Sequence, residues 1–179
     1  MTGINNKTLK IVMVGVFAAV IAVLSQVAIP LPSGVPVTLQ TLAIALCGYV
    51  LGAALGGLST GVYLALGAVG VPVFANLQGG VARLVGLTGG FLWGFLPMVI
   101  LCGLAVRSKK PIPAVLFSAA GLLVCHALGV TQYAILSHNN WWASFLLVSM
   151  PYLLKDAVSM VVAYGLAAAL RRALTRVTG

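Results

Sequence analysis

Acidic side chains are almost absent from this sequence, which has one aspartate or glutamate against ten lysines and arginines in 179 residues. Only 6% of its residues are charged, whereas a water-soluble domain carries about a quarter. Hydrophobic residues make up 61% of the chain, and the mean hydropathy is +1.15. Because so few polar side chains cannot form a water-soluble surface, we predict an all-α integral membrane protein.

The lone acid also restricts the chemistry of the chain. A single carboxylate provides neither an acid–base pair nor a magnesium cage. The three cysteines, Cys47, Cys102 and Cys125, lie in separate apolar runs without C-x-x-C spacing, which favours buried packing over a metal site or a disulfide. No Walker-type phosphate loop is present, so any coupling to ATP must come from a partner. We predict no enzyme, no cofactor and no metal site.

Long apolar runs separated by prolines, glycines or polar clusters indicate membrane spans, each of which needs about 20 residues. Six such runs cover about residues 9–29, 37–55, 58–73, 84–106, 114–136 and 141–170. The loops between them are short. We therefore predict a single membrane domain over residues 1–179, folded as a six-transmembrane-helix bundle.

The basic residues are distributed unevenly over these spans. Eight of the ten fall on one side of a six-span map: Lys7, Lys10, Arg107, Lys109, Lys110, Arg171, Arg172 and Arg176. By the positive-inside rule that side is cytoplasmic. We therefore predict a multi-pass protein of the cell (inner) membrane with both termini cytoplasmic. The net charge of +9 reflects this orientation in the lipid bilayer, and no nucleic-acid partner is predicted.

Two basic residues do not fit that rule. Arg83 lies in an outer loop, and Lys155 lies within the last span beside the only acid, Asp156. A lysine at the centre of a span costs about 2.5 to 3.5 kcal/mol on insertion scales. Neighbouring residues on a helix point about 100° apart, so we expect at least one of Lys155 and Asp156 to meet another group. For Asp156, ligand binding is favoured over packing.

Other polar residues gather on the predicted outer face. The loop over residues 76–90 and the start of the second span contribute Asn76, Gln78, Gly79, Gly80, Arg83, Thr88 and Gln40. Gln40 is equally consistent with a hydrogen bond between helices. Trp141 and Trp142 are typical of interfacial anchors. Together, the amides, backbone donors, carboxylate and cations predict an outward-facing cavity for a small molecule with an anionic end and a neutral hydrogen-bonding end.

Three stretches resemble the BioY family: IPLPSGVPVTLQTL at 29–42, GGVARLVGLTGGFLWGF at 79–95 and PYLLKDAV at 151–158. The likeness extends over nearly the whole chain. It implies the biotin-specific substrate-binding subunit, or S component, of an energy-coupling factor (ECF) transporter. Such a subunit takes up biotin together with a transmembrane scaffold subunit and two ABC-type ATPase subunits.

The resemblance also implies roles for individual residues. Asp156 corresponds to the aspartate that would accept hydrogen bonds from the ureido N–H groups of biotin. Gln78 corresponds to the polar residue before the Gly79-Gly80 pair. Thr88 and Phe91 belong to the stretch that matches G-P-T-G-G-Y, in which Leu87 replaces proline and Phe91 replaces tyrosine.

The counter-charge for the biotin carboxylate differs from that of some relatives. They carry a basic residue about one turn after the aspartate, where this chain has Ser159. We predict that Lys155, Arg83 or both provide this charge, with Arg83 favoured because its loop can adapt to the ligand.

An A-x-x-x-A motif in the first helix of such subunits packs against the scaffold. Ala18 and Ala22 fit this motif, and Gly15 and Ala19 form a second pair of small residues four apart. Packing within the bundle remains an alternative for both pairs.

Two alternative functions remain open from the sequence. One is an S component for another vitamin. The other is a proton-coupled secondary carrier that uses Asp156 as a relay, since intramembrane acids often serve that role.

Overall fold

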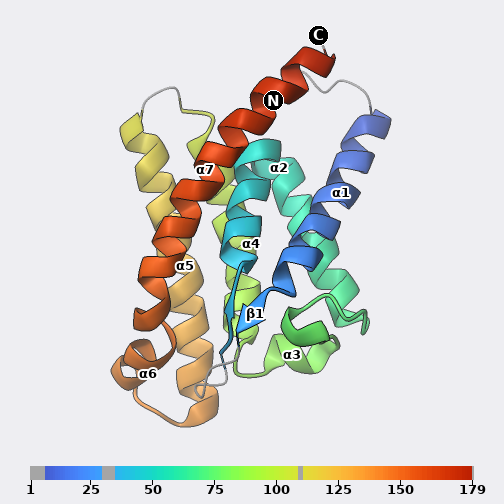
Figure 1. Ribbon diagram of the computed structural model, residues 1–179. Helices are drawn as coiled ribbons and strands as arrows, with labels where there is room; N and C mark the ends of the chain where they lie inside the picture. The colour runs from blue at the N-terminus through green and yellow to red at the C-terminus, as the bar shows by residue number, and fades with distance from the viewer. Residues whose placement is uncertain (1–6, 30–34, 109–110, 179) are drawn as a thin grey trace.

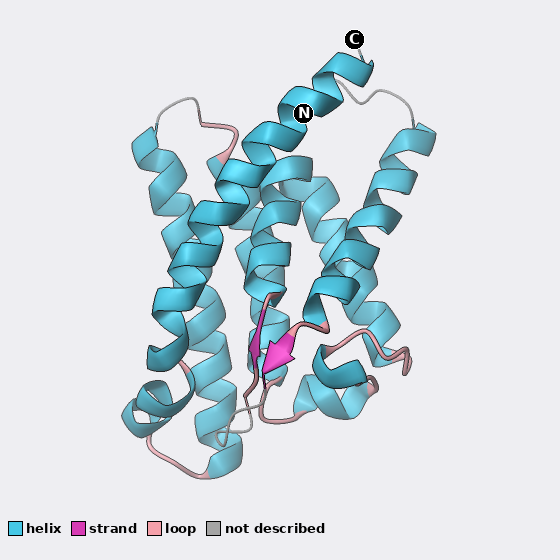
Figure 2. Ribbon diagram, in the orientation of Figure 1, coloured by secondary structure: helices cyan, strands magenta, loops and turns pink. Residues whose placement is uncertain are grey.

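The computed structural model describes residues 7–29, 35–108 and 111–178, and nearly all of its elements are helices (Figure 2). The elements are α1 (Lys7–Ser25), β1 (Ala28–Ile29), β2 (Val37–Thr38), α2 (Gln40–Ala68), η1 (Ala75–Leu77), α3 (Val81–Val85), α4 (Gly89–Ala105), α5 (Pro111–Ser137), α6 (Trp141–Val148) and α7 (Met150–Thr178). The predicted all-α class is confirmed.

Among the described residues, four helices are long and apolar enough to cross a membrane: α1, α2, α5 and residues 150–173 of α7. The apolar helix α4 is shorter, with 17 residues. It lies in the middle of the bundle and packs mainly against α2 and α5 (Figure 1). The chain is thus built as a membrane bundle.

Helix α2 is interrupted at Gly52, whose φ of 81° and ψ of 176° are outside the helical region. The sequence placed this break at Gly56-Gly57, which is wrong. Glycine alone adopts such a φ readily, so Gly52, Gly56 and Gly57 are all able to break the helix. Helix α4 packs closely on this break, since a side chain at Gly103 of α4 would overlap the backbone of Gly52 and Ala53. The predicted third span also ends earlier, at Ala68.

The predicted sixth span, 141–170, is two helices and not one. Ser149 lies between α6 and α7 with φ −125° and ψ −54°. Two residues later Pro151 has no N–H to donate to a carbonyl of the preceding turn, and a helix breaks readily there. The predicted fourth span is likewise divided into α3 and α4, and the first ends at Ser25. The fifth prediction, 114–136, agrees with α5.

The two ends of the bundle differ in structure. Figure 1 shows the start of α1 and the end of α7 at one end of the bundle, whereas the β1–β2 hairpin, α3 and α6 lie at the other. The hairpin pairs Ala28 with Thr38 and Ile29 with Val37 in antiparallel register. Irregular backbone is also concentrated at this second end, where Asn76, Leu77, Gly80 and His138 have positive φ. Helices thus give way to loops at the end that holds the site.

Close helix contacts hold the bundle together. A side chain at Gly94 of α4 would touch the Cα of Cys125 on α5, and one at Gly48 of α2 would touch the Val99 carbonyl on α4. Small residues let two helices approach closely, and the van der Waals packing between them drives helix association in lipid. The three cysteines are buried and free, as predicted from their apolar surroundings.

Candidate ligand-binding site

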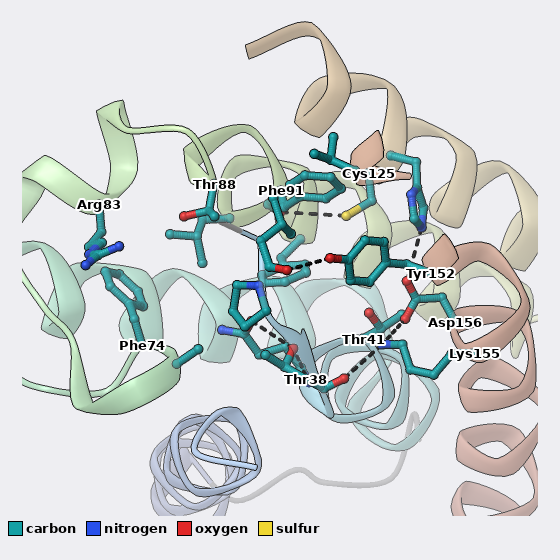
Figure 3. A pocket seen from close by; sticks show the side chains of 18 of the residues that line it. Thr38, Thr41, Phe74, Arg83, Thr88, Phe91, Cys125, Tyr152, Lys155 and Asp156 are labelled. Carbon is teal, nitrogen blue, oxygen red and sulfur yellow. Dashed lines mark hydrogen bonds and ion pairs between the residues drawn. The ribbon is translucent and has the colours of Figure 1, made fainter. Parts of the chain in front are cut away.

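A cavity of about 160 Å³ opens at the irregular end of the bundle. Its walls come from the β2–α2 junction, the 74–78 loop, α3, α4, α5 and α7. The predicted residues that line it are Gln40, Asn76, Gln78, Arg83, Thr88, Phe91, Lys155 and Asp156. Segments far apart in sequence therefore meet around one space (Figure 3).

At one side of the cavity Asp156 is buried and has a partner at each carboxylate oxygen. Its Oδ1 forms an ion pair with Nζ of Lys155, and its Oδ2 lies 3.2 Å from Nε2 of His126. The Lys155 ammonium also donates to the Thr38 carbonyl, at 2.8 Å. Adjacent Lys155 and Asp156 thus pair directly in spite of the 100° between them, because the long lysine side chain bends back to its neighbour. Both do meet other groups as well.

His126 was missed by the sequence reasoning. It lies on α5 inside a predicted span, is 5% exposed and lines the cavity. Its Nδ1 is 2.8 Å from the Ser149 hydroxyl at the α6–α7 break. The available signal was its position, since an ionisable residue inside an apolar span is generally functional.

Gln40 both bridges helices and lines the cavity, so the two readings of this residue are compatible. Its Nε2 donates to the Tyr63 hydroxyl at 2.7 Å, and its Oε1 accepts from Thr38 Oγ1 at 3.1 Å. The Tyr63 hydroxyl is in turn 3.0 Å from Ser25 Oγ of α1. This buried network joins α1, α2 and the hairpin beneath the cavity.

The loop that carries Asn76 and Gln78 is held by the side chain of the residue directly after α1. Gln26 Nε2 lies within hydrogen-bond distance of the Val73 and Phe74 carbonyls, at 3.1 and 3.2 Å. Its Oε1 accepts from Leu77 N–H at 2.9 Å. These bonds stabilise a tight turn and direct Asn76 and Gln78 to the cavity wall.

Gly79 and Gly80 were predicted in the site, but they do not line the cavity. Gly80 has φ +96° and donates its N–H to the Gly67 carbonyl at 2.6 Å. A side chain at Gly79 would collide with the backbone of Gly70 and Val71. The structure thus gives both glycines a role in shaping the loop. Ser159 is buried on α7 and is also outside the lining.

Arg83 lies on α3, and Figure 3 shows it on the opposite side of the cavity from Asp156 and Lys155. It is half-buried. Within the described part of the chain, its guanidinium forms no hydrogen bond or ion pair. Gln132 of α5 supports this region by donating to the Leu84 and Gly86 carbonyls, at 3.1 and 2.7 Å.

Phe91 forms an aromatic wall of the cavity. Its ring packs edge-to-face with His126, at a centroid distance of 5.8 Å and an interplanar angle of 90°. Nearby, the Tyr152 hydroxyl donates to the Val35 carbonyl. The cavity therefore combines apolar walls with polar groups at two separate sides, the usual form of a small-molecule site.

The small residues of α1 face in two directions. Ala18 is 3% exposed and Ala22 packs against the core, whereas Gly15 and Ala19 are exposed. Ala18 and Ala22 therefore pack within the bundle, which is the alternative that the sequence left open for this pair. Gly15 and Ala19 lie beside the exposed Ile11 and Val16 on a face without a neighbour among the described residues.

A helical membrane bundle with a polar-sided cavity at one end belongs to the class of membrane-embedded small-molecule binding proteins. The fold matches a crystal structure described as the S-component for biotin from an ECF-type ABC transporter. The TM-score is 0.85, the match covers 94% of each chain, and the sequences are 23% identical.

Sequence comparison defines the family. The BioY family model matches residues 1–176, and the chain belongs to the BioY family. It is 38% identical to the biotin transporter BioY of Thermotoga maritima, covering 91% of this chain and 96% of the relative. It is 36% identical to BioY of Rhodobacter capsulatus, over 86% and 88% of the two chains, and to BioY2 of Lactococcus lactis, over 96% and 94%. The family is one of transporters and not of enzymes.

Proposed function

We propose that this protein captures biotin and mediates its uptake as the substrate-binding S component of an ECF-type transporter. The observation that carries the proposal is the match of the BioY family model to residues 1–176. The biotin transporters among its relatives and the shared S-component fold support it. The cavity supports it independently, because its polar groups suit the two ends of biotin.

The ureido ring of biotin binds at the Asp156 side in this proposal. A carboxylate only accepts hydrogen bonds, and the ureido group offers two N–H donors. Asp156 is buried there and faces the cavity beside Phe91, whose ring provides an apolar surface. Gln78 and Asn76 line the same cavity and can bond the ureido oxygen or a ring N–H.

The biotin carboxylate binds Arg83. Lys155 is already paired with Asp156 and the Thr38 carbonyl, whereas the Arg83 guanidinium has no partner among the described residues. A free, half-buried guanidinium suits a carboxylate well, since its fork of donors forms charge-assisted bonds. This distribution favours Arg83 over Lys155 as the counter-charge.

The chain crosses the membrane six times in this proposal, with both termini cytoplasmic. The break at Gly52 divides α2 into two segments, which add to α1, α4, α5 and α7. Basic residues at the terminal end of the bundle support this orientation by the positive-inside rule: Lys7, Lys10, Arg107, Arg171 and Arg172. The cavity then opens to the outside, where biotin is captured.

A scaffold subunit and two ATPases supply the energy for transport in this proposal. The exposed face of α1 with Gly15 and Ala19 is the docking surface for the scaffold, because small residues let helices approach closely. Ala18 and Ala22 contribute by packing α1 on the bundle.

Uptake of labelled biotin tests the proposal in cells that lack their own biotin transport. We expect uptake when the chain is produced with an energising module and its loss when the ATPases are inactivated. Uptake that ignores the ATPases and collapses with a proton ionophore would instead establish the proton-coupled carrier. Binding of another vitamin in place of biotin by the purified protein would reassign the substrate.

A further inference from the structure

One buried ionisable group beside the cavity has no role in the function proposed above. His126 of α5 touches both Ser149, at the α6–α7 break, and Asp156 of α7. All three side chains are at most 5% exposed. Two helices and a helix break thus converge on this imidazole, directly behind the only carboxylate of the chain.

Hydrogen-bond chemistry determines how these groups are connected. An ionised carboxylate only accepts, so the proton of the imidazole lies on Nε2 and is donated to Asp156 Oδ2. In the neutral ring, Nδ1 is then an acceptor, and the Ser149 hydroxyl donates to it at 2.8 Å. Phe91 packs edge-to-face against the same ring. The imidazole is therefore held at both nitrogens and at its face.

The arrangement leaves part of the carboxylate available. Lys155 pairs with Oδ1, His126 contacts Oδ2, and the Thr41 side chain also hydrogen-bonds the carboxylate. A carboxylate has about four lone-pair positions, which leaves acceptor capacity toward the cavity. Without His126, only the flexible side chain of Lys155 and the short side chain of Thr41 would orient the carboxylate.

We infer that His126, braced by Ser149, is a positioning residue that holds the Asp156 carboxylate ready to accept the two N–H groups of a cyclic urea. The inference rests on the proposed function, since biotin supplies that ring. In this inference His126 affects only the end of the ligand that carries the ureido ring. Changing His126 must therefore weaken ligands that share the ureido ring by the same factor, whatever group stands at the carboxylate end.

Three variants separate positioning from structural support. His126→Leu removes both nitrogens, whereas His126→Gln retains an amide N–H that can reach Asp156. Ser149→Ala keeps the ring and removes only the bond to Nδ1. His138→Gln is the matched control, because His138 is the other histidine of the chain and lies outside the cavity lining, in the α5–α6 connection.

Binding of biotin and of its neutral carboxamide to the purified full chain in detergent tests the inference, with thermal unfolding of the unliganded protein as the folding control. We expect His126→Leu to weaken both ligands about 30-fold, as expected for a lost bond to a charged group. His126→Gln should bind both ligands with an affinity within about fivefold of wild type, and the affinity of Ser149→Ala should lie between those of the two His126 variants. His138→Gln should bind like wild type.

Wild-type affinity in His126→Leu would overturn the inference, as would equal weakening in His126→Leu and His126→Gln with unchanged thermal stability. If His126→Leu does not fold, Ser149→Ala decides, and its wild-type affinity would overturn the inference. Failure of the wild-type chain itself to bind biotin would overturn the proposed function, which distinguishes that failure from a failure of the His126 assignment.

Discussion

The two sides of the cavity are built differently. At the Asp156 side, every polar group is buried or half-buried and held by others: Lys155 by Asp156 and the Thr38 carbonyl, and His126 by Ser149 and Asp156. Arg83, in contrast, stands on a helix of five residues and lacks a protein partner among the described residues. One side is organised in the empty protein, and in the proposed function the biotin carboxylate completes the other.

The physical reason is burial. A charge inside an apolar bundle is costly unless it is paired and hydrogen-bonded, so the Asp156 side must be organised in the empty protein. A half-exposed guanidinium keeps part of its hydration and needs no fixed partner. The first side is therefore suited to recognising a rigid neutral ring, and the second to attracting an anion.

The largest effect is expected from Asp156→Asn, which destroys the organised side. The amide places donors opposite the donors of the ureido ring and leaves the Lys155 ammonium without its carboxylate. Loss of bonds to a charged group costs about 3 kcal/mol, so biotin affinity should fall about 100-fold. Titration calorimetry of the purified protein measures it, and thermal unfolding shows whether the variant is folded. Near-wild-type affinity would mean that the ring binds elsewhere.

A smaller effect is expected from Arg83→Ala, which removes the free cation. Because the group is half-exposed, we expect biotin affinity to fall only about tenfold and the remaining affinity to depend less on salt. The neutral carboxamide of biotin should bind wild type and variant equally. Arg107→Ala, at the other end of the bundle, is the matched control. An equal loss for both ligands would contradict the division of the cavity into two sides.

Gln132→Leu sharpens the comparison further, since it disturbs the support of α3 and not Arg83 itself. The variant loses the bonds to the Leu84 and Gly86 carbonyls. We expect about a fivefold loss for biotin, of the size of one or two neutral hydrogen bonds, and little change for the carboxamide. Competition binding with both ligands measures this. A larger loss of affinity for the carboxamide than for biotin would contradict a role of Gln132 in supporting Arg83.

Asn76→Ala should have the smallest effect. The side chain is exposed at the rim of the cavity, where water can replace a lost hydrogen bond. We expect biotin affinity to fall about twofold, against about fivefold for the half-buried Gln78→Ala. Side-by-side binding measurements decide the order, and the reverse order would place Asn76 nearer the ligand than Gln78.

Contacts between side chains and the positions of helix breaks were predicted least well. Lys155 and Asp156 were expected to diverge because their Cβ atoms do, yet the lysine side chain is long enough to reach back. His126 was overlooked because its partners lie 23 and 30 residues away, across a helix break that Pro151 favours. The break in α2 was placed at the wrong glycines because Gly52, Gly56 and Gly57 are equally able to adopt a positive φ.

The sequence by itself determined the membrane class, the helical architecture and the family. The class and the architecture follow from composition and from apolar runs, because lipid requires long hydrophobic helices whatever their packing. The family follows from the resemblance of the stretches at 29–42, 79–95 and 151–158. It also indicated most of the polar residues that line the cavity. Only the tertiary structure decided which of them meet, because hydrogen bonds and ion pairs depend on distances of a few ångströms between α2, α5 and α7. The pairing of Asp156 with His126, and the lack of a partner for Arg83 among the described residues, both depend on this packing.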